Sequence, residues 1–258
     1  MVTNHHVVRN AEHITVTTKD GRQLEATLTG GDQATDIALL KVEPDGLLEL
    51  VLGDSDTLKV GDVVIAVGNP FGLGQTVTSG IVSALGRSGL SAGKFEDFIQ
   101  TDASINPGNS GGALMNTQGE LMGINTAIIA PGGGNVGIGF AIPSNMVKAV
   151  MQQLLLHGAV KRGRIGISIQ TITPDIASAM GLPVQKGAVV TKVEPGSPAE
   201  RAGLAPGDAI VAVDGKTVSD AGDLRNEVGL RERGQTVELT YYRKATRRVA
   251  KVRIGAAP

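Results

Sequence analysis

The chain has no cysteine among its 258 residues. This absence excludes disulfide bonds, catalysis by a thiol nucleophile and zinc sites that need cysteine ligands. Histidine is also scarce, with residues only at positions 5, 6, 13 and 157, and none of them belongs to a His-Glu-x-x-His motif. The sequence therefore predicts neither a catalytic metal nor any other cofactor.

The sequence also lacks a strong net charge and long apolar runs. Its formal net charge of -1 gives no electrostatic reason to expect a nucleic-acid partner, and the basic run at 243–253 is interpreted as a solvated strand edge. No apolar run approaches the length of a membrane span. The residues after Met1 form neither a charged n-region nor an apolar h-region, so we expect no signal peptide in this chain.

The first part of the chain contains many short strand patterns. Apolar and polar residues alternate over 13–19 and 22–29 around Asp20-Gly21, which is typical of a hairpin. A helix is predicted at 144–156, with Ser144 as its N-cap. Strands without intervening helices indicate an all-β sandwich or barrel. The further strands are predicted at 37–42, 62–67, 75–85, 96–101, 113–116, 120–129 and 136–142.

The pattern changes after the basic link at 161–164, where strands begin to alternate with short helices. We therefore predict two domains, residues 1–160 and a smaller α+β domain at residues 161–258. The strands of the second domain are expected at 165–172, 187–194, 208–214, 235–243 and 246–254. Its helices are expected at 174–180, 198–202 and 220–230.

Within the first domain, the run Asn106-Pro-Gly-Asn-Ser-Gly-Gly112 places one hydroxyl between glycines. A serine that attacks a carbonyl must stand clear of side chains, beside NH groups that face the developing oxyanion. Gly108 can adopt the positive φ that directs its NH and that of Ser110 towards one point, and Gly111 and Gly112 would let substrate approach. The same residue types are common in polar turns, so this motif alone leaves both interpretations open.

A nucleophilic serine needs a histidine base and a carboxylate that orients the base. The candidates are His6 and Asp36, and the apolar strand at 37–42 would shelter the carboxylate. The chain order histidine, aspartate, serine is that of the chymotrypsin-like β-barrels. Asp32 is the rival carboxylate, but we interpret it as a turn residue because no apolar strand follows it directly.

At this point the sequence resembles the HtrA (Deg) family of serine endoproteases, above all its DegQ/DegP branch. The resemblance implies a mainly β fold, in which a chymotrypsin-like double β-barrel precedes a small α+β PDZ domain. It implies that His6 is the general base, Asp36 its orienting carboxylate and Ser110 the nucleophile, and that His5 stands where the family often has Asn. The matching runs are Thr3 to Val8, Thr35 to Lys41, Val67 to Gly74, Thr78 to Gly86, Phe98 to Asp102, Gly108 to Leu114 and Gly137 to Pro143.

The resemblance also implies where substrate binds in the first domain. The oxyanion hole is expected at Gly108, Asn109 and Ser110, with the first and last of these supplying the NH groups. The specificity pocket beside the serine should be apolar and contain no acid, which favours cleavage after small aliphatic residues. The expected pocket residues are Ile105, Ile129, Gly139, Phe140 and Ala141.

In the second domain, the carboxylate-binding loop of a PDZ fold would be Arg164-Ile165-Gly166-Ile167. Backbone NH groups of such a loop hold a C-terminal carboxylate, while the peptide adds as a strand against 167–171. The helix at 220–230, with Leu224 and Val228, would form the other wall of the groove.

The chain departs from the family ahead of His6, which only five residues precede. Two average strands need about ten to twelve residues, so the first barrel is expected to be incomplete, with open strand edges. By comparison with the family pattern, we also expect this chain to lack the N-terminal segment through which HtrA proteins form trimers and the second PDZ domain of the DegQ/DegP branch. A homotrimer or higher oligomer is therefore an expectation for the family, and this chain lacks the segment that would form it.

Two functions remain open on the sequence. The first is an ATP-independent endopeptidase of the periplasm that degrades unfolded or misfolded proteins and binds their C-termini with its PDZ domain. The second is a catalytically inert module that binds peptides or unfolded chains through the PDZ groove. A different acyl-transfer hydrolase on the same barrel is a third hypothesis, disfavoured because a PDZ domain suits protein tails.

Overall fold

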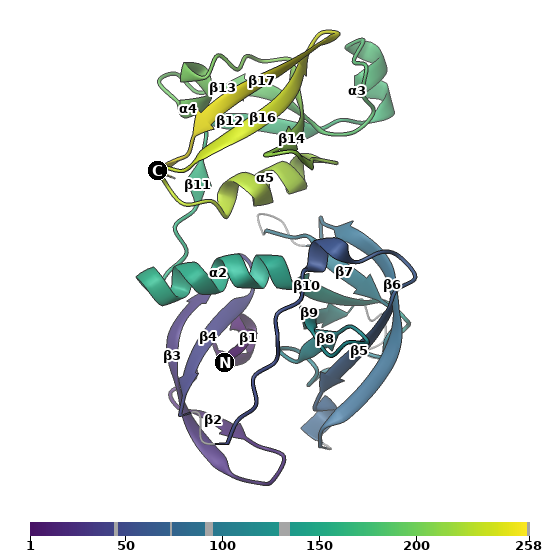
Figure 1. Ribbon diagram of the computed structural model, residues 1–258, viewed down its shortest axis with the longest axis vertical. Coiled ribbons are helices and arrows are strands. Elements are labelled where there is room, and N and C mark those ends of the chain that lie inside the picture. The colour runs from purple at the N-terminus through teal and green to yellow at the C-terminus, as the bar shows by residue number, and fades with distance from the viewer. Residues whose placement is uncertain (44–45, 73, 91–94, 129–134, 257–258) are drawn as a thin grey trace. The chain divides into compact units, whose positions relative to one another are not determined.

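The computed structural model describes residues 1–258 apart from 44–45, 73, 91–94, 129–134 and 257–258. The chain divides into two compact units, Met1–Val160 and Lys161–Pro258 (Figure 1). Unit 1 is built mainly from β-strands and unit 2 from strands and short helices, each around its own hydrophobic core, as the sequence predicted. In the described part of the chain, no helix is long and apolar enough to cross a membrane.

The first half of unit 1 is an open antiparallel sheet with the strand order β1-β4-β3-β2. Its central strand β4 buries four consecutive apolar side chains, Ile37 to Leu40. Among the described strands, β1 and β2 each pair with one strand only, so the sheet does not close and the prediction of an incomplete first barrel is confirmed. The elements are β1 (Val2–Asn4), α1 (His5–Val8), β2 (Ile14–Thr17), β3 (Gln23–Asp32) and β4 (Ile37–Val42).

The second half of unit 1 is a closed barrel with the strand order β10-β7-β6-β5-β8-β9. Apolar side chains that alternate along the strands, such as Val64 and Ala66 of β5, fill its interior. The strands are β5 (Val63–Gly68), β6 (Thr76–Arg87), β7 (Phe98–Thr101), β8 (Ala113–Met115), β9 (Leu121–Ile128) and β10 (Gly139–Pro143). Two 3-10 helices, η1 (Ser55–Thr57) and η2 (Pro70–Gly72), lie in the connections.

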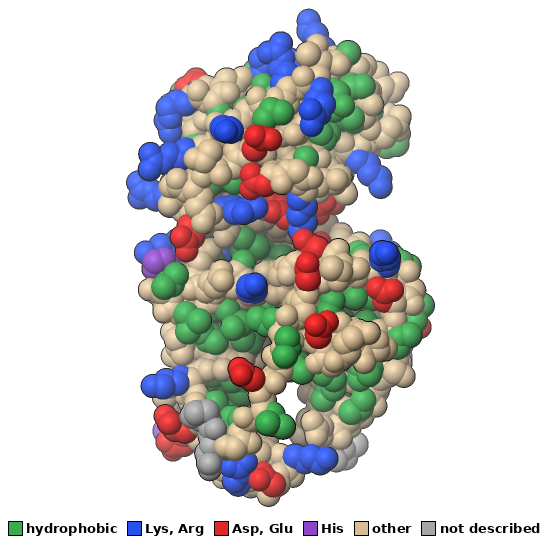
Figure 2. Space-filling view, in the orientation of Figure 1, with side chains coloured by type: hydrophobic (Ala, Val, Ile, Leu, Met, Phe, Trp, Pro, Cys, Tyr) green, Lys and Arg blue, Asp and Glu red, His purple; other side chains and the backbone are tan. Residues whose placement is uncertain are grey.

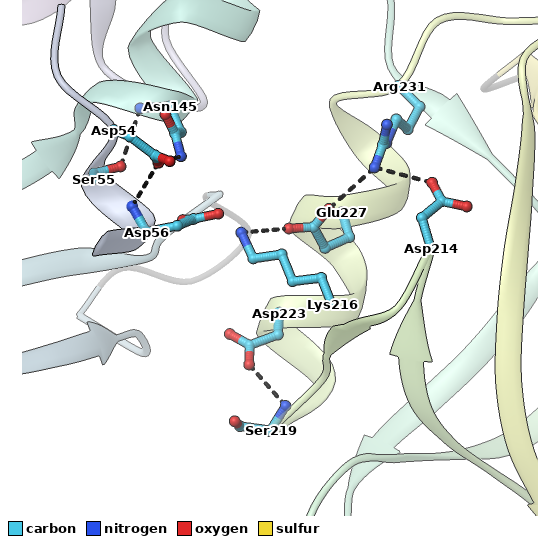
Figure 3. A network of polar contacts seen from close by, with 10 residues as sticks. All are labelled: Asp54, Ser55, Asp56, Asn145, Asp214, Lys216, Ser219, Asp223, Glu227 and Arg231. Atoms are coloured by element: carbon cyan, nitrogen blue, oxygen red, sulfur yellow. Dashed lines mark hydrogen bonds and ion pairs between the residues drawn. The ribbon is translucent and has the colours of Figure 1, made fainter. Parts of the chain in front are cut away.

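The helix α2 (Ser144–His157) completes unit 1, but its N-terminus is capped differently from the prediction. Ser144 is already helical, and its hydroxyl donates to the carbonyl of Gly53 (2.7 Å). The NH of Asn145 instead donates to Oγ of Ser55 (3.1 Å), while the side chain of Asn145 donates to Asp54 (2.7 Å; Figure 3). The hydroxyl of Ser55 in η1 thus replaces the cap that a residue next to the helix would provide. Because Ser55 is distant from α2 in the sequence, residue spacing could not predict this cap.

The strand predicted at 136–142 begins later, at Gly139, because Asn135 organises the preceding turn. Its Oδ1 accepts a hydrogen bond from the NH of Gly137 (2.5 Å), and its Nδ2 donates to the carbonyl of Ile105 (2.8 Å). An Asn side chain that bonds the backbone two residues on forms a local turn in competition with strand pairing. Residues 135–138 therefore lie outside the β10 ladder.

Unit 2 is a mixed α+β domain around a sheet with the order β12-β13-β14-β16-β17. β15 pairs with β14, and β11 pairs with β18 in a separate two-stranded sheet. The strands are β11 (Gly163–Arg164), β12 (Ile167–Thr171), β13 (Ala188–Val193), β14 (Asp208–Val213), β15 (Lys216–Thr217), β16 (Thr236–Arg243), β17 (Thr246–Arg253) and β18 (Gly255–Ala256). The helices are α3 (Pro174–Ala179), α4 (Pro198–Arg201) and α5 (Ala221–Gly229).

The strand predicted at 165–172 begins only at Ile167, and Gly166 separates it from the short strand β11. Gly166 has a φ of +78°, and a Cβ at this position would lie 2.4 Å from Cβ of Ser197. Only glycine combines this backbone conformation with such a close approach. The chain therefore turns between β11 and β12 instead of continuing as one strand.

Polar contacts fix the first turn of α5 and the turn before it (Figure 3). Asp220 is the N-cap and accepts a hydrogen bond from the NH of Asp223 (2.9 Å), whose own carboxylate accepts one from the NH of Ser219 (2.8 Å). Burial raises the pKa of Asp223 above its ordinary value. Glu227 forms ion pairs with Lys216 (2.9 Å) and Arg231 (3.6 Å), so both ends of α5 are anchored.

The two units differ in charge although the whole chain is nearly neutral. Asp and Glu outnumber Lys and Arg in residues 1–160, and the reverse holds in residues 161–258. Figure 2 shows many Lys and Arg side chains on the visible face of unit 2. The near-zero net charge therefore results from two units of opposite sign.

Candidate active site

His6 and Asp36 lie in direct contact on the open sheet of unit 1. Nδ1 of His6 lies 2.7 Å from Oδ2 of Asp36, and the NH of His6 donates to Oδ1 of the same carboxylate (2.9 Å). The carboxylate is mostly sheltered, at 17% exposure, whereas the imidazole is 41% exposed. The ring is therefore held at Nδ1, which leaves Nε2 as the nitrogen that can exchange a proton with a bound molecule.

The backbone of Asp36 has an unusual conformation that directs its carboxylate to His6. Its φ is +59°, a value that non-glycine residues seldom adopt and that Asp tolerates better than most. The carbonyl of Asp36 accepts hydrogen bonds from the NH of His5 (3.0 Å) and from Nδ2 of Asn4 (3.0 Å). The segment before His6 thus holds the carboxylate-bearing residue in place.

The neighbouring histidine His5 and the rival carboxylate Asp32 lie outside the contact between His6 and Asp36. The ring of His5 is next to Gly31, because a Cβ on Gly31 would lie 2.7 Å from its Cδ2. Asp32 ends β3 and accepts hydrogen bonds from the NH and hydroxyl of Thr35. Asp32 therefore stabilises the turn between β3 and β4, at the end of a strand that extends further than predicted.

Ser110 follows a tight turn formed by residues 106–109. The NH of Asn109 donates to the carbonyl of Asn106 (2.9 Å), Pro107 is the second residue, and Gly108 has a φ of +102°. Proline followed by glycine with a positive φ is characteristic of a type II turn. This turn uses the NH of Asn109, whereas the NH groups of Gly108 and Ser110 have no hydrogen-bond partner within the described residues. These are the two NH groups that were expected to form the oxyanion hole, which stays a prediction.

The glycines around Ser110 allow protein segments to pack against the turn. A Cβ on Gly111 would lie 2.1 Å from Oγ1 of Thr3, and one on Gly112 would lie 2.1 Å from the carbonyl of Val67. The space that a Cβ on these glycines would fill is thus occupied by β1 and β5, and the approach of substrate to this turn stays a prediction. The turn is wedged between the two halves of unit 1.

Thr126 connects the serine turn to Asp36, and sequence reasoning missed it. Its hydroxyl donates to Oδ2 of Asp36 (2.8 Å), and its carbonyl accepts a hydrogen bond from Oγ of Ser110 (3.2 Å). Between His6 and Ser110, both described in the structure, there is no direct hydrogen bond. Ser110 is therefore in a resting position, with its hydroxyl bound to the backbone of β9.

A β-bulge explains why Thr126 can reach both groups. Phe140 of β10 faces Ala127, but the next residue, Ala141, faces Asn125, so Thr126 is left out of the ladder. An extra residue of this kind redirects its side chain and carbonyl. Asn125 and Thr126 are both buried and polar in a largely apolar strand, which is the signal that could have identified them from the sequence.

Four of the five residues expected to form the specificity pocket lie within the described part of the chain. Ile105 and Ala141 are buried in the core of the closed barrel, and Gly139 lies against Ile105, since a Cβ on it would be 2.8 Å from Cδ1. The ring of Phe140 packs against Phe98, with centroids 5.9 Å apart. The fifth expected residue, Ile129, lies outside the described residues. The pocket therefore stays a prediction.

In unit 2, the loop from Arg164 to Ile167 is held from both sides. Its carbonyl groups at Ile165 and Gly166 accept hydrogen bonds from Ala199 and Glu194 (both 2.9 Å), and the side chain of Arg164 pairs with Glu194. The NH groups of Ile165 and Gly166 have no partner within the described part of the chain. Two adjacent free NH groups are suited to binding an anion such as a carboxylate.

The strand β12 borders this loop and has a free edge, because its only pairing partner among the described strands is β13. Leu224 and Val228 of α5 are buried in the core of unit 2 together with Ile165, and Ile167 packs against this cluster. The helix therefore lies beside β12 with its apolar side facing the strand. An extended peptide could pair with β12 between these two elements.

No cluster of three or more His, Asp or Glu side chains within the described ranges is placed to bind a metal ion. The groups available for chemistry are thus an imidazole, a carboxylate, a hydroxyl and backbone NH groups. This combination can carry out acyl transfer through a serine nucleophile.

Comparison with known proteins agrees with this class of site. Residues 1–124 match the family model of the trypsin-like peptidase domain, and residues 163–254 match that of the PDZ domain. The fold and the matches define a trypsin-like serine peptidase domain followed by a PDZ domain. Within that class, the chain belongs to the HtrA family.

Individual relatives support the assignment. The chain is 54% identical over 240 residues to the periplasmic pH-dependent serine endoprotease DegQ of Escherichia coli strain K12. The aligned residues cover 93% of this chain and 53% of that relative. It superimposes on the HtrA-type protease AlgW with tripeptide at a TM-score of 0.81, with 46% identity, covering 100% of this chain and 85% of that one. For the serine endoprotease from Yersinia pestis the TM-score is 0.65 and the identity 40%, with coverage of 100% and 85%. The chain spans about half the length of the curated relatives it matches.

Replacing Thr126 with valine tests the link between β9 and Asp36. Valine keeps the shape of the side chain but cannot donate to Oδ2, so the carboxylate loses one of its hydrogen bonds. We expect the rate constant for reaction of Ser110 with a fluorophosphonate to fall about tenfold, the effect of one hydrogen bond of about 1.4 kcal/mol. Stopped-flow or gel-based labelling measures this rate. The control is Thr126→Ser, which keeps the hydroxyl; equal rates for Thr126→Val and the original chain would contradict the assignment.

Proposed function

We propose that the chain is a serine endopeptidase in which His6, Asp36 and Ser110 act as a catalytic triad. The observation that carries the proposal is the chain of contacts from His6 through Asp36 and Thr126 to Ser110, beside two unpaired NH groups. These residues come from both halves of unit 1.

In the proposed reaction, Ser110 first leaves the carbonyl of Thr126 and turns its hydroxyl towards His6. Oγ attacks the carbonyl carbon of the scissile peptide bond while Nε2 of His6 takes the proton, and Asp36 stabilises the resulting imidazolium. The oxyanion accepts hydrogen bonds from the NH groups of Gly108 and Ser110. His6 then protonates the leaving amine, and the C–N bond breaks to leave an acyl-enzyme.

Water completes the reaction. His6 removes a proton from a water molecule that attacks the acyl carbon. The second tetrahedral intermediate then breaks its bond to Oγ of Ser110, and the protonated His6 returns the proton to that oxygen. The cycle consumes only the peptide and water. Hydrolysis by this route therefore requires no ATP and no cofactor.

The substrates that suit this site are extended chains. A peptide must be unfolded to reach Ser110 and to pair with the edge of β12, so we propose unfolded or misfolded proteins as substrates and their C-termini as ligands of the PDZ groove. Relatives of this chain are named periplasmic endoproteases, which supports a periplasmic location. Assembly into a homotrimer stays a prediction from the family.

The open first sheet favours one competing function. Because β1 and β2 keep free edges among the described strands, His6 rests on a sheet that is less supported than a closed barrel. If this support is insufficient, the chain acts as an inert module that binds peptides through unit 2.

Covalent labelling of Ser110 separates the two functions. We expect a fluorophosphonate probe to label the chain and Ser110→Ala to remain unlabelled, because only an activated serine attacks the probe at a useful rate. His6→Ala is expected to slow labelling at least about a hundredfold, since the general base is lost. An unlabelled chain that still binds peptides would favour the inert module.

Cleavage specificity tests the expected pocket. We expect cleavage after Val, Ala or Ile and little cleavage after Lys or Arg, because Ile105, Gly139 and Ala141 provide no carboxylate. A peptide library with each residue at the P1 position, analysed by mass spectrometry, measures the preference. Predominant cleavage after basic residues would show that the pocket lies elsewhere.

Peptide binding tests unit 2. We expect a peptide with a free C-terminal carboxylate and an apolar last residue to bind at least about tenfold more tightly than its C-terminal amide, because the charge-assisted bonds to the loop are lost in the amide. Ile167→Asp should abolish binding. Val249→Asp, on the exposed face of β17, is the matched control and should bind normally. Equal affinity for acid and amide, measured by fluorescence anisotropy, would refute the carboxylate site.

A further inference from the structure

Asn4 stands at the N-cap position of α1 but does not cap the helix. Its backbone has the extended conformation usual for a cap, with φ -76° and ψ 145°, yet its side chain makes no capping hydrogen bond. Asn is among the best N-cap residues, because its Oδ1 readily accepts a hydrogen bond from the first turn. The side chain of Asn4 therefore does not serve as the N-cap of α1.

The side chain of Asn4 is instead committed to Asp36. The residue is completely buried, at 0% exposure, and Nδ2 donates to the carbonyl of Asp36 (3.0 Å). A carbonyl oxygen can only accept, so the amide nitrogen must face it and Oδ1 must point away. Oδ1 is buried without a hydrogen-bond partner among the described residues. A side chain that leaves a buried acceptor unpaired breaks the usual rule of satisfied polar groups, and such exceptions concentrate at functional sites.

The bond from Asn4 acts on the most unusual backbone position of the site. Asp36 adopts a φ of +59°, which must be stabilised by its surroundings. Its carbonyl is held by Nδ2 of Asn4 and the NH of His5, while its Oδ1 is held by the NH of His6. These three donors come from consecutive residues, so the direction of the carboxylate and the position of the imidazole are set by the same short segment.

We propose that Asn4 is a positioning residue of the catalytic site, which keeps Asp36 in its left-handed conformation and so aligns the carboxylate with Nδ1 of His6. The inference rests on the proposed function, because it concerns the same triad. Asn4 acts through Asp36 and makes no contact with Ser110. Its contribution is the geometry of the His6–Asp36 hydrogen bond, on which proton transfer to and from the imidazole depends.

The test compares two equivalent substitutions in the full chain. Asn4→Asp preserves shape but places an acceptor against the carbonyl of Asp36. Asn145→Asp makes the same chemical change in unit 1, where Nδ2 of Asn145 donates to Oδ1 of Asp54 at the start of α2. We expect Asn4→Asp to lower kcat between about tenfold and a hundredfold with little change in KM, because the reacting groups are misaligned while peptide binding is preserved. Asn145→Asp should keep the kcat of the original chain.

A spectroscopic readout separates positioning from general destabilisation. The proton between Nδ1 of His6 and Asp36 gives a far-downfield ¹H NMR resonance when the hydrogen bond is short and ordered, and we expect Asn4→Asp to shift or broaden it while Asn145→Asp leaves it unchanged. Asn4→Ser, which is smaller, provides a second variant if Asn4→Asp does not fold, and it should show the same loss. The resonance can be recorded in Ser110→Ala, so this test also stands if the original chain proves inactive.

The outcomes distinguish the two proposals. Failure of a fluorophosphonate to label the original chain would refute the proposed function, whatever the NMR spectra show. An Asn4 variant that folds with the original kcat and an unchanged downfield resonance would refute the positioning role. A folded variant with raised KM and unchanged kcat would also refute it, because that result would place Asn4 in substrate binding.

Discussion

The hydrogen bonds that converge on Asp36 are the interaction on which the site depends. Its carboxylate binds His6 at two points and Thr126 at a third, while its carbonyl is held by the segment before His6. Thr126 belongs to the closed barrel, whereas His6 lies in α1 and Asp36 in the turn before β4, both in the first half of unit 1. One carboxylate therefore joins the two halves of unit 1, and the orientation of the imidazole follows from how those halves pack.

The two units carry net charges of opposite sign, although the net charge of the whole chain is close to zero. A formal net charge of -1 suggested no electrostatic preference, yet acidic residues dominate unit 1 and basic residues dominate unit 2. Charges within one unit interact over a Debye length of about 8 Å at physiological salt, so each unit presents its own local field to solvent. Partners that meet unit 1 and unit 2 separately therefore encounter surfaces of opposite sign.

Local patterns were sufficient to predict most strands, since alternation along β2 and β3 and the apolar run of β4 are written in adjacent residues. Residue type and order along the chain indicated a histidine near position 6 and Asp36, and the resemblance to the HtrA family selected His6 over His5. The roles of Thr126, Asn4 and Ser55 could not be predicted in this way, because each depends on a contact with a segment distant in sequence. Long-range contacts of this kind are fixed by strand register and packing, which local propensity does not encode.

The bulge in β9 shows that the number of residues in a strand is itself part of the site. Thr126 reaches Asp36 and Ser110 because one residue of β9 has no partner on β10. Deleting any single residue between the bulge and the end of the strand would restore an even ladder and turn the hydroxyl away, while leaving every catalytic side chain in the sequence. Such a deletion would break the connection through Thr126 and slow the reaction of Ser110, although His6, Asp36 and Ser110 would all remain in the chain.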